Sequence, residues 1–559
     1  MLRALIKRDK TEAGKVANQT LADLFRGKAG EIAEAKDKQP KVLEMIASVF
    51  GKDDSGRYRD AQVAGPSLAF LATVIKDAGA IEEAIVFFQE ALTVVPSSTS
   101  YALNYAHTLE ILYLYDGARD VALSFLEANV GLSAPAALGS HRLSVREVVD
   151  VMRRWSVGSG DGGSGQGAAL PAFEQDLFDV DLDKAPESIL TKAYTMASKR
   201  SSSATTTEEW EIEWMQEKGK DTMNYAVARK NGSGKEEGKV LEQIVTALAA
   251  SSGKLQQLSA DELDLLALLF TVVKMAFLAG DLDLIGPLVA LIEPVRVGRK
   301  LHHTSIRNEA AYYCCVAQLM EQVVTKRESI GLPKIYACGD SHVLPLAWQR
   351  MRVDGKETQI VPRLATGVKA WHLREESTFY PKRNFQSAVA SIPKGAKAIF
   401  VFCEIDCREG IYVALEKARY KTLEQGIRAV VDIYVSVLLE IVKDPVDEAT
   451  KGRTRRHICA EPEWRARGLT IYVHPVLPVL DVTRPLVLAF NEVLAAQVRK
   501  LRHPRIRWLA GLYEELLDGA GKLKQRYELD GTHIHPRYIG ERLEPSLAAA
   551  LGEKRRGEE

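Results

Sequence analysis

The sequence has no excess of charge of either sign, because its 74 lysine and arginine residues balance its 74 aspartate and glutamate residues. A chain without net charge carries no overall electric field that would favour nucleic acid or an anionic membrane surface. A short basic run, Lys451–Arg456, is typical of a solvated loop. We therefore expect no nucleic-acid partner.

Cysteines are few, and their spacing is uninformative. The six cysteines form no paired Cys-x-x-Cys motif, which argues against a zinc ribbon and against a disulfide framework. Cys403 and Cys407 are four residues apart but have no histidine pair beside them that would complete a metal site. We expect neither a metal nor an organic cofactor, and a reducing compartment.

Long apolar segments are also missing. The N-terminus turns polar after six residues and lacks the apolar core of a signal peptide. The most apolar stretch, Leu265–Gly280, is interrupted by Lys274 and is short for a bilayer span, so it predicts a core helix. We expect a cytoplasmic protein without a membrane span.

A chain of 559 residues is too long for one hydrophobic core, so several domains are expected. The glycine-rich run Gly158–Gly167 is typical of a flexible linker. The predicted divisions are a helical segment at 1–60, helical repeats at 61–150, a flexible and partly helical linker region at 151–240, a further repeat-like helical region at 241–330, and an α/β domain at 331–552.

Two neighbouring segments, Ser67–Pro96 and Tyr101–Leu132, have the same internal pattern. Each reads as two amphipathic helices with small residues where the helices cross. The small residues recur 34 positions apart, in the pairs Ala72 with Ala106 and Ala84 with Ala118. This period predicts a helical repeat.

The repeat resembles the tetratricopeptide repeat, whose pattern is matched by Ala72, Gly79, Ala84, Phe88, Ala91 and Pro96. The second copy has Tyr113 in place of the glycine and Val130 in place of the proline. The resemblance implies a concave surface for a protein partner. An unrelated pair of helical hairpins is the alternative.

From residue 334 onward, short apolar runs alternate with helical stretches, which predicts a parallel sheet covered on both faces. Helices are expected at about 343–353, 410–443 and 485–501. The predicted strands are Ile335–Cys338, Gln359–Val361, Ala398–Cys403, Leu469–His474 and Ile506–Leu509.

The first of these strands is followed by Gly339, Asp340 and Ser341, and a new apolar pattern begins at Val343. A strand, a glycine turn and a helix start would place the serine hydroxyl at the carboxyl edge of the sheet, facing the helix amides. Ser341 is therefore the candidate nucleophile.

A candidate base occurs near the C-terminus, where Asp530 precedes His533 by three residues. This spacing can place the carboxylate on the near ring nitrogen, which orients the imidazole while the far nitrogen takes the serine proton. Ser341, His533 and Asp530 then supply a nucleophile, a base and an orienting acid.

The Gly-Asp-Ser motif with the Asp-x-x-His motif resembles the SGNH, or GDSL-type, hydrolases over residues 333–551. The resemblance implies a flavodoxin-like sheet and hydrolysis of esters, often of acyl groups carried by sugars or lipids. It also implies a glycine amide in the oxyanion hole, for which Gly367 is the candidate. A plain turn glycine is the alternative for Gly367.

One block departs from that family's pattern. Where the family has Gly-x-Asn-Asp, with an asparagine that also serves the oxyanion, this chain has Cys403–Asp406 with Ile405 at the asparagine position. An isoleucine side chain cannot donate a hydrogen bond. Glu404, Asp406 and Arg408 place three charged side chains at the carboxyl end of a buried strand, where ligands bind, so all three are candidate substrate residues. Arg408 could replace the missing donor, or could bind a carboxylate or phosphate of the substrate. The alternative is a structural ion pair of Arg408 with Glu404 or Asp406.

Two functions follow from these residues. The first is a serine ester hydrolase acting on an acyl-ester substrate, or an acyltransferase if an alcohol replaces water. The second is an inactive SGNH-like domain in a scaffold whose helical repeats bind a protein partner. The intact Ser341, His533 and Asp530 favour the enzyme, whereas the missing asparagine favours the scaffold.

Overall fold

The computed structural model describes residues 51–155, 257–322, 331–444 and 464–552, apart from short gaps. The chain forms two compact units, one made of residues 1–122 with 326–559 and the other of residues 123–325. Most of the helical segment predicted at 1–60 and of the linker region predicted at 151–240 lies outside the described residues, as does Lys451–Arg456. The boundaries between the five predicted domains therefore stay a prediction.

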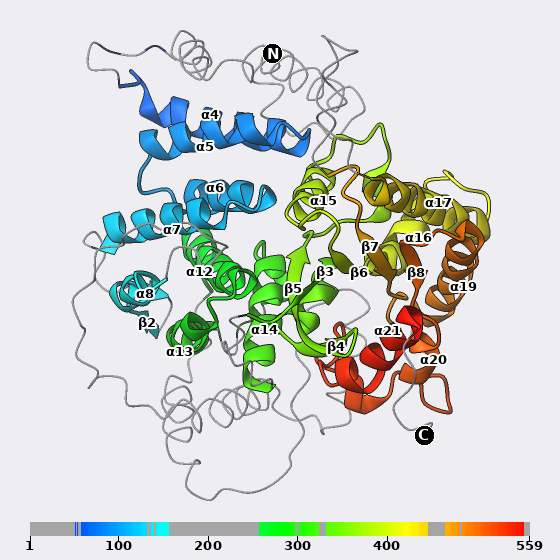
Figure 1. Cartoon of the computed structure of the whole chain (residues 1–559). Helices are drawn as coiled ribbons and strands as arrows, with labels where there is room; N and C mark the ends of the chain where they lie inside the picture. Colours follow the sequence, from blue (N-terminus) through cyan, green and yellow to red (C-terminus); the bar gives the residue numbers. More distant parts are fainter. Residues whose placement is uncertain are drawn as a thin grey trace, which may run out of the picture. The chain divides into compact units, whose positions relative to one another are not determined.

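The first unit contains a six-stranded sheet in the order β4-β5-β3-β6-β7-β8 (Figure 1). Every neighbouring pair is parallel except β4 with β5. Without β4, the strands follow the order 2-1-3-4-5 of doubly wound sheets. The strands are β3 (Lys334–Gly339), β4 (Arg350–Val353), β5 (Lys356–Leu364), β6 (Lys397–Val401), β7 (Thr470–Val473) and β8 (Ile506–Trp508). The prediction of a mostly parallel α/β sheet is confirmed.

The helix predicted at 343–353 is wrong. A short 3-10 helix, η4 (Ser341–Leu346), contains Pro345 and is followed by strand β4, which pairs antiparallel with β5. The turn between these strands is Asp354-Gly355, and both residues have a positive φ. This dipeptide is a strong hairpin signal, because both central residues of a type I′ turn need that conformation.

Helices α15 (Tyr380–Ala390), α17 (Leu423–Val442) and α19 (Arg484–Leu501) cover one face of this sheet. Alternate strand residues point to that face, so Tyr336 and Cys338 share a core with Phe385 of α15 and Tyr434 of α17. The predicted helix at 410–443 is divided into α16 (Ile411–Glu416) and α17, and the one at 485–501 is α19. Helix α15 was not predicted. The remaining elements are η5 (Ala370–Leu373), η6 (Asp406–Gly410), α20 (Leu512–Leu516), η8 (Gln525–Tyr527), η9 (Ile539–Leu543) and α21 (Glu544–Leu551).

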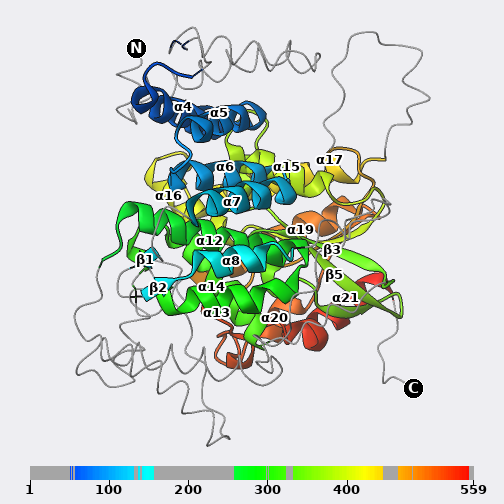
Figure 2. The same ribbon diagram turned by 90° about the vertical axis from the view of Figure 1, so that its left-hand side faces the viewer.

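The repeated segments near the N-terminus are helical, as predicted. They comprise α4 (Ala61–Asp77), α5 (Ile81–Val94), α6 (Thr99–Ile111) and α7 (Tyr115–Val130), and α4 lies beside α5 in Figures 1 and 2. The alanines that recur with a 34-residue period, Ala72, Ala84, Ala106 and Ala118, have no exposed surface. Gly79 and Tyr113, which occupy equivalent positions in the two copies, both have a positive φ.

The second unit is mostly helical in its described part. Its longest helix, α12 (Ala260–Ala279), begins with a Ser259–Glu262 capping box and ends at Gly280 in the left-handed conformation. Residues 266–278 are all buried, so the prediction of a core helix is confirmed. None of the described helices has the length and apolar character needed to span a bilayer. The other elements are β1 (Ala136–Leu138), β2 (His141–Leu143), α8 (Val145–Met152), η2 (Leu282–Leu284), α13 (Ile285–Arg296), η3 (Leu301–His303) and α14 (Arg307–Gln322).

Candidate active site

The candidate site lies at the carboxyl edge of the sheet, where the strand order reverses. Strand β3 has β5, the second of the parallel strands in the sequence, on one side and β6, the third, on the other. Such a switch point is where open α/β sheets bind ligands. Ser341 follows β3 at this edge, and the block Cys403–Arg408 follows β6.

Gly339 ends β3 at a point where no side chain fits. A Cβ atom at this position would overlap the carbonyl oxygen of Val401 and lie 2.9 Å from Cγ1 of Val343. The backbone of β3 can therefore approach β6 closely only with glycine at this position. The following turn carries Asp340 and the half-buried Ser341 into η4.

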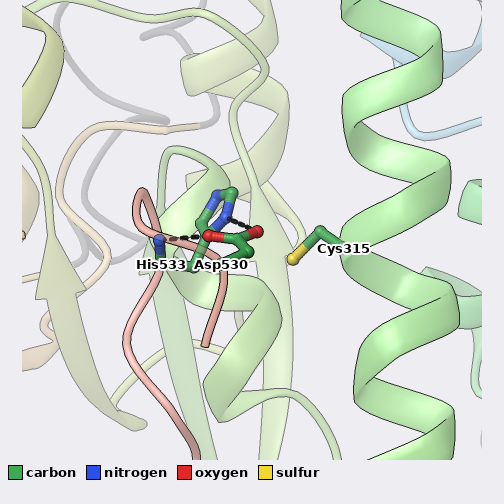
Figure 3. A group of neighbouring side chains, drawn as sticks. All are labelled: Cys315, Asp530 and His533. Atoms are coloured by element: carbon green, nitrogen blue, oxygen red, sulfur yellow. Dashed lines mark hydrogen bonds and ion pairs between the residues drawn. The ribbon is translucent and has the colours of Figure 1, made fainter. Parts of the chain in front are cut away.

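Asp530 and His533 form the pair that their spacing predicts (Figure 3). Oδ2 of Asp530 lies 2.7 Å from Nδ1 of His533, and Oδ1 accepts hydrogen bonds from the amides of Thr532 and His533. Gly531 has a φ of 70°, which permits this tight turn. Burial alone would raise the pKa of Asp530, but His533 and the two amides lower it, so the carboxyl is held ionised.

The far nitrogen of His533 is available. Nε2 is buried and has no hydrogen-bond partner among the described residues, so Ser341 Oγ does not reach it in this conformation. The neighbours of these two residues are nevertheless in contact, since Nε2 of His342 lies 3.0 Å from the carbonyl oxygen of Thr532. The predicted nucleophile and base therefore come from adjacent segments of the same edge.

A second Asp–His pair was not predicted. Nδ1 of the buried His342 lies 2.8 Å from Oδ1 of Asp340, and its Nε2 faces the Thr532 carbonyl. Because both ring nitrogens face oxygen acceptors, the arrangement suits a protonated imidazole. Burial lowers the pKa of His342, but the charge and hydrogen bond of Asp340 outweigh it, and the pKa is raised. The Asp-x-His spacing directly after a strand was the signal for this pair.

A third histidine, His474, follows β7 and is also buried. Its Nδ1 lies 2.7 Å from the carbonyl oxygen of Pro475, and its Nε2 lies 3.4 Å from the hydroxyl of Tyr538. Burial is the main reason that the pKa of His474 is lowered to about 4, and the charge of His342 acts in the same direction. His474 is therefore neutral near neutral pH.

Gly367, the candidate oxyanion donor, lies in the turn after β5, is exposed and has a φ of 63°. Asp406 fixes the backbone just beyond this turn, because its carboxyl oxygens accept hydrogen bonds from the amides of Ala370 and Trp371. Burial raises the pKa of Asp406 to about 7. The structure thus gives Asp406 a role in holding the loop; its contribution to substrate binding stays a prediction.

Arg408 and Glu404 form an ion pair, with Nη1 of Arg408 3.3 Å from Oε2 of Glu404. This is the structural pairing that was the alternative to an oxyanion role. Cys403 has a φ of 80°, a conformation that favours glycine. The side chain of Ile405 donates no hydrogen bond, so the SGNH resemblance of this block stays a prediction.

Comparison with protein-family models, with curated proteins and with solved structures finds no match to this chain. The assignment of the site therefore depends on its own residues and geometry.

Proposed function

We propose that this protein is a serine ester hydrolase in which Ser341 is the nucleophile, His533 the general base and Asp530 the residue that orients it. The observation that carries the proposal is the state of His533. Its Nδ1 is held by an ionised carboxylate, and its Nε2 is buried and without a hydrogen-bond partner in the described part of the chain. This is the arrangement that a base needs before it receives a proton.

In the proposed reaction, Ser341 Oγ attacks the ester carbonyl while Nε2 of His533 takes the hydroxyl proton. The amides of Ser341 and Gly367 stabilise the resulting oxyanion, and His533 returns the proton to the departing alcohol. Water then attacks the acyl-enzyme with His533 again as base, which releases the acid and restores Ser341. An acceptor alcohol in place of water would make the same site an acyltransferase.

The absence of a bond between Ser341 and His533 in this conformation is compatible with the proposal. Catalytic hydrogen bonds are often long or misaligned without substrate and tighten in the Michaelis complex. A rotation of the serine side chain about χ1 moves its hydroxyl without displacing the backbone.

The test is hydrolysis of p-nitrophenyl acetate by the wild-type protein, by Ser341→Ala and by Ser436→Ala. Ser436 is exposed on α17 and serves as the matched control. The proposal expects turnover that falls about a thousandfold or more in Ser341→Ala and is unchanged in Ser436→Ala. Equal background rates in all three proteins would contradict it.

The second candidate is a catalytically inactive ligand-binding module. It is favoured by Ile405, which lacks the amide of the family's asparagine, and by the engagement of Arg408 with Glu404. Loss of one oxyanion donor lowers the rate by about 10²–10³-fold. Isoleucine in place of asparagine at position 405 therefore favours a site without measurable activity. The equal background rates described above would make this candidate the better one.

We further propose that the helices α4–α7 form tetratricopeptide-like repeats that recruit a protein partner. The buried alanines with a 34-residue period and the shared backbone conformation of Gly79 and Tyr113 support this proposal. A cytoplasmic location is proposed as well. It is supported by the spacing of the six cysteines in the sequence, which lacks the paired pattern of a disulfide framework.

A further inference from the structure

The end of helix α6 contacts the turn that carries the candidate oxyanion donor. The hydroxyl of Tyr113 donates a hydrogen bond of 2.6 Å to the carbonyl oxygen of Leu364, the last residue of β5. Tyr113 and Leu364 are 251 positions apart in the sequence but belong to the same compact unit. The helical region therefore contacts the backbone three residues before Gly367.

A second contact reaches the same backbone through helix α15. The side chain of Asn384 accepts a hydrogen bond of 2.7 Å from the amide of Thr366 and donates one of 3.1 Å to the carbonyl oxygen of Ile111 at the end of α6. Asn384 is buried, with 3 % of its surface exposed. Its amide thus joins the end of α6 to the residue that directly precedes Gly367.

The residue between these two contacts is bound to the nucleophile strand. The amide of Ala365 donates a hydrogen bond of 2.7 Å to the carbonyl oxygen of Gly339, two residues before Ser341. Leu364, Ala365 and Thr366 are therefore each fixed by a different element. Two of the three restraints come from the end of α6 and the turn that follows it: Tyr113 binds directly, and Ile111 acts through Asn384.

The backbone conformation of Tyr113 indicates that the surrounding structure holds its side chain against Leu364. Its φ of 64° is unfavourable for a residue with a Cβ atom and persists only where the surroundings enforce it. The ring of Tyr113 packs against the hydrophobic core of the α/β sheet. The left-handed turn after α6 thus directs a side chain into the α/β domain, where Gly79 in the preceding repeat has none.

We propose that Tyr113 and Asn384 are positioning residues through which the helical region sets the backbone of the Gly367 turn. In this account the helices α4–α6 complete the esterase site and do more than recruit a partner. The inference rests on the proposed esterase function for its effect on catalysis. The positioning itself is a statement about the amides of residues 365 and 366, and it can be measured without any substrate.

The experiment compares the full-length wild-type protein with Tyr113→Phe, Asn384→Ala and the control Arg383→Gln. Tyr113→Phe removes one hydroxyl and keeps the ring. Arg383 lies next to Asn384 and forms an exposed ion pair of 2.6 Å with Glu82 of α5, so its replacement weakens a different contact between α15 and the helical region without touching the turn. Two quantities are measured for each protein: hydrogen–deuterium exchange of the amides at 365 and 366, and kcat and KM for p-nitrophenyl acetate.

We expect Tyr113→Phe, which loses the hydrogen bond to Leu364, to exchange these amides about tenfold faster and to lower kcat about three- to tenfold with KM unchanged. Asn384→Ala loses two hydrogen bonds and should show effects at least as large. An oxyanion donor acts in the transition state, so its displacement affects kcat. Arg383→Gln should match the wild type in both measurements.

Unchanged exchange in Tyr113→Phe, or equally fast exchange in Arg383→Gln, would overturn the inference. If the wild type hydrolyses no ester but the exchange result holds, the positioning stands and the esterase proposal fails. If the exchange result holds and kcat is unaffected, the turn is positioned by α6 but Gly367 is not an oxyanion donor, and the catalytic part of the inference is overturned.

Discussion

The centroids of the imidazole rings of His342 and His533 lie 5.3 Å apart. His342 is hydrogen-bonded to Asp340, and His533 to Asp530. The two pairs differ in the far ring nitrogen. Nε2 of His342 faces the Thr532 carbonyl, whereas Nε2 of His533 has no hydrogen-bond partner among the residues that the structure describes. Of these two histidines, only His533 has a nitrogen ready to accept a proton from a serine.

Replacing Asp530 should therefore affect catalysis strongly. In Asp530→Asn the carboxylate that stabilises the imidazolium is lost, and we expect kcat for p-nitrophenyl acetate to fall by about 10²–10⁴-fold. The matched control is Asp432→Asn, an exposed aspartate on α17 that should leave kcat unchanged. A kcat within a factor of two of the wild type would show that Asp530 does not orient a base.

Protonation of His342 should make stability dependent on pH. The pKa of His342 is raised in the folded protein above its ordinary value of 6.5. The folded state therefore binds this proton more tightly than the unfolded chain does. The stabilisation is fully present below about pH 6.5 and is lost as the pH rises through the folded pKa. His474 acts in the opposite sense only between about pH 4 and 6.5, because its pKa is lowered to about 4.

The measurement is the unfolding midpoint from pH 6.5 to 9 for the wild type, for His342→Gln and for the control His303→Gln, an exposed histidine. We expect the wild type and His303→Gln to lose stability with rising pH and His342→Gln to show a flatter curve. Parallel curves for all three proteins would contradict a protonated His342.

Gly339 should tolerate no larger residue. In Gly339→Ala the added Cβ overlaps the Val401 carbonyl, and neither strand can move without breaking the ladder, so we expect a loss of more than about 3 kcal/mol in the free energy of unfolding. Gly540→Ala is the control, because a Cβ there meets nothing within 4 Å. Urea titrations of the two variants make the comparison. If Gly339→Ala and Gly540→Ala unfold at similar urea concentrations, the backbones of β3 and β6 do not approach each other as closely as the structure shows.

The Arg408–Glu404 pair gives a prediction about stability. Glu404 is buried, so Arg408→Gln removes the ion-pair partner of a buried carboxylate. We expect a loss of about 1–3 kcal/mol in the free energy of unfolding, below the range for fully buried pairs because Arg408 is partly exposed. The double variant Arg408→Gln/Glu404→Gln should regain part of the lost free energy of unfolding, because it no longer buries an unpaired carboxylate.

The exposed pair Arg428–Glu424 on α17 is the matched control for Arg408. Arg428→Gln should change the free energy of unfolding by less than about 0.5 kcal/mol. If Arg408→Gln unfolds like Arg428→Gln but has a much lower kcat, Arg408 serves the reaction and not the fold.

The strands of the parallel sheet could be predicted from the sequence because buried strands are short, continuous apolar runs. Strand β4 was missed for a physical reason. Its residues alternate between exposed and buried, and the hairpin signal Asp354-Gly355 was not used. Pro345 was a reason to doubt a long helix after Ser341, since it interrupts the backbone hydrogen bonds of a helix interior.

The pairing of Asp530 with His533 could be predicted because both residues belong to one local turn. The bond between His342 and Thr532 joins segments 190 residues apart, and the contact between Tyr113 and Leu364 joins segments 251 apart. Spacing within the sequence carries no information on such contacts. They depend on how the helical region and the C-terminal loop pack against the sheet.

The most direct test of the central claim is covalent labelling of Ser341. The full-length protein is treated with an alkyl fluorophosphonate, which reacts with activated serine hydroxyls, and the labelled residue is located by peptide mass spectrometry. The account predicts one adduct per chain, on Ser341, that is absent from both Ser341→Ala and His533→Gln. An unlabelled wild-type protein, or labelling of Ser341 that persists in His533→Gln, would contradict a nucleophile activated by His533.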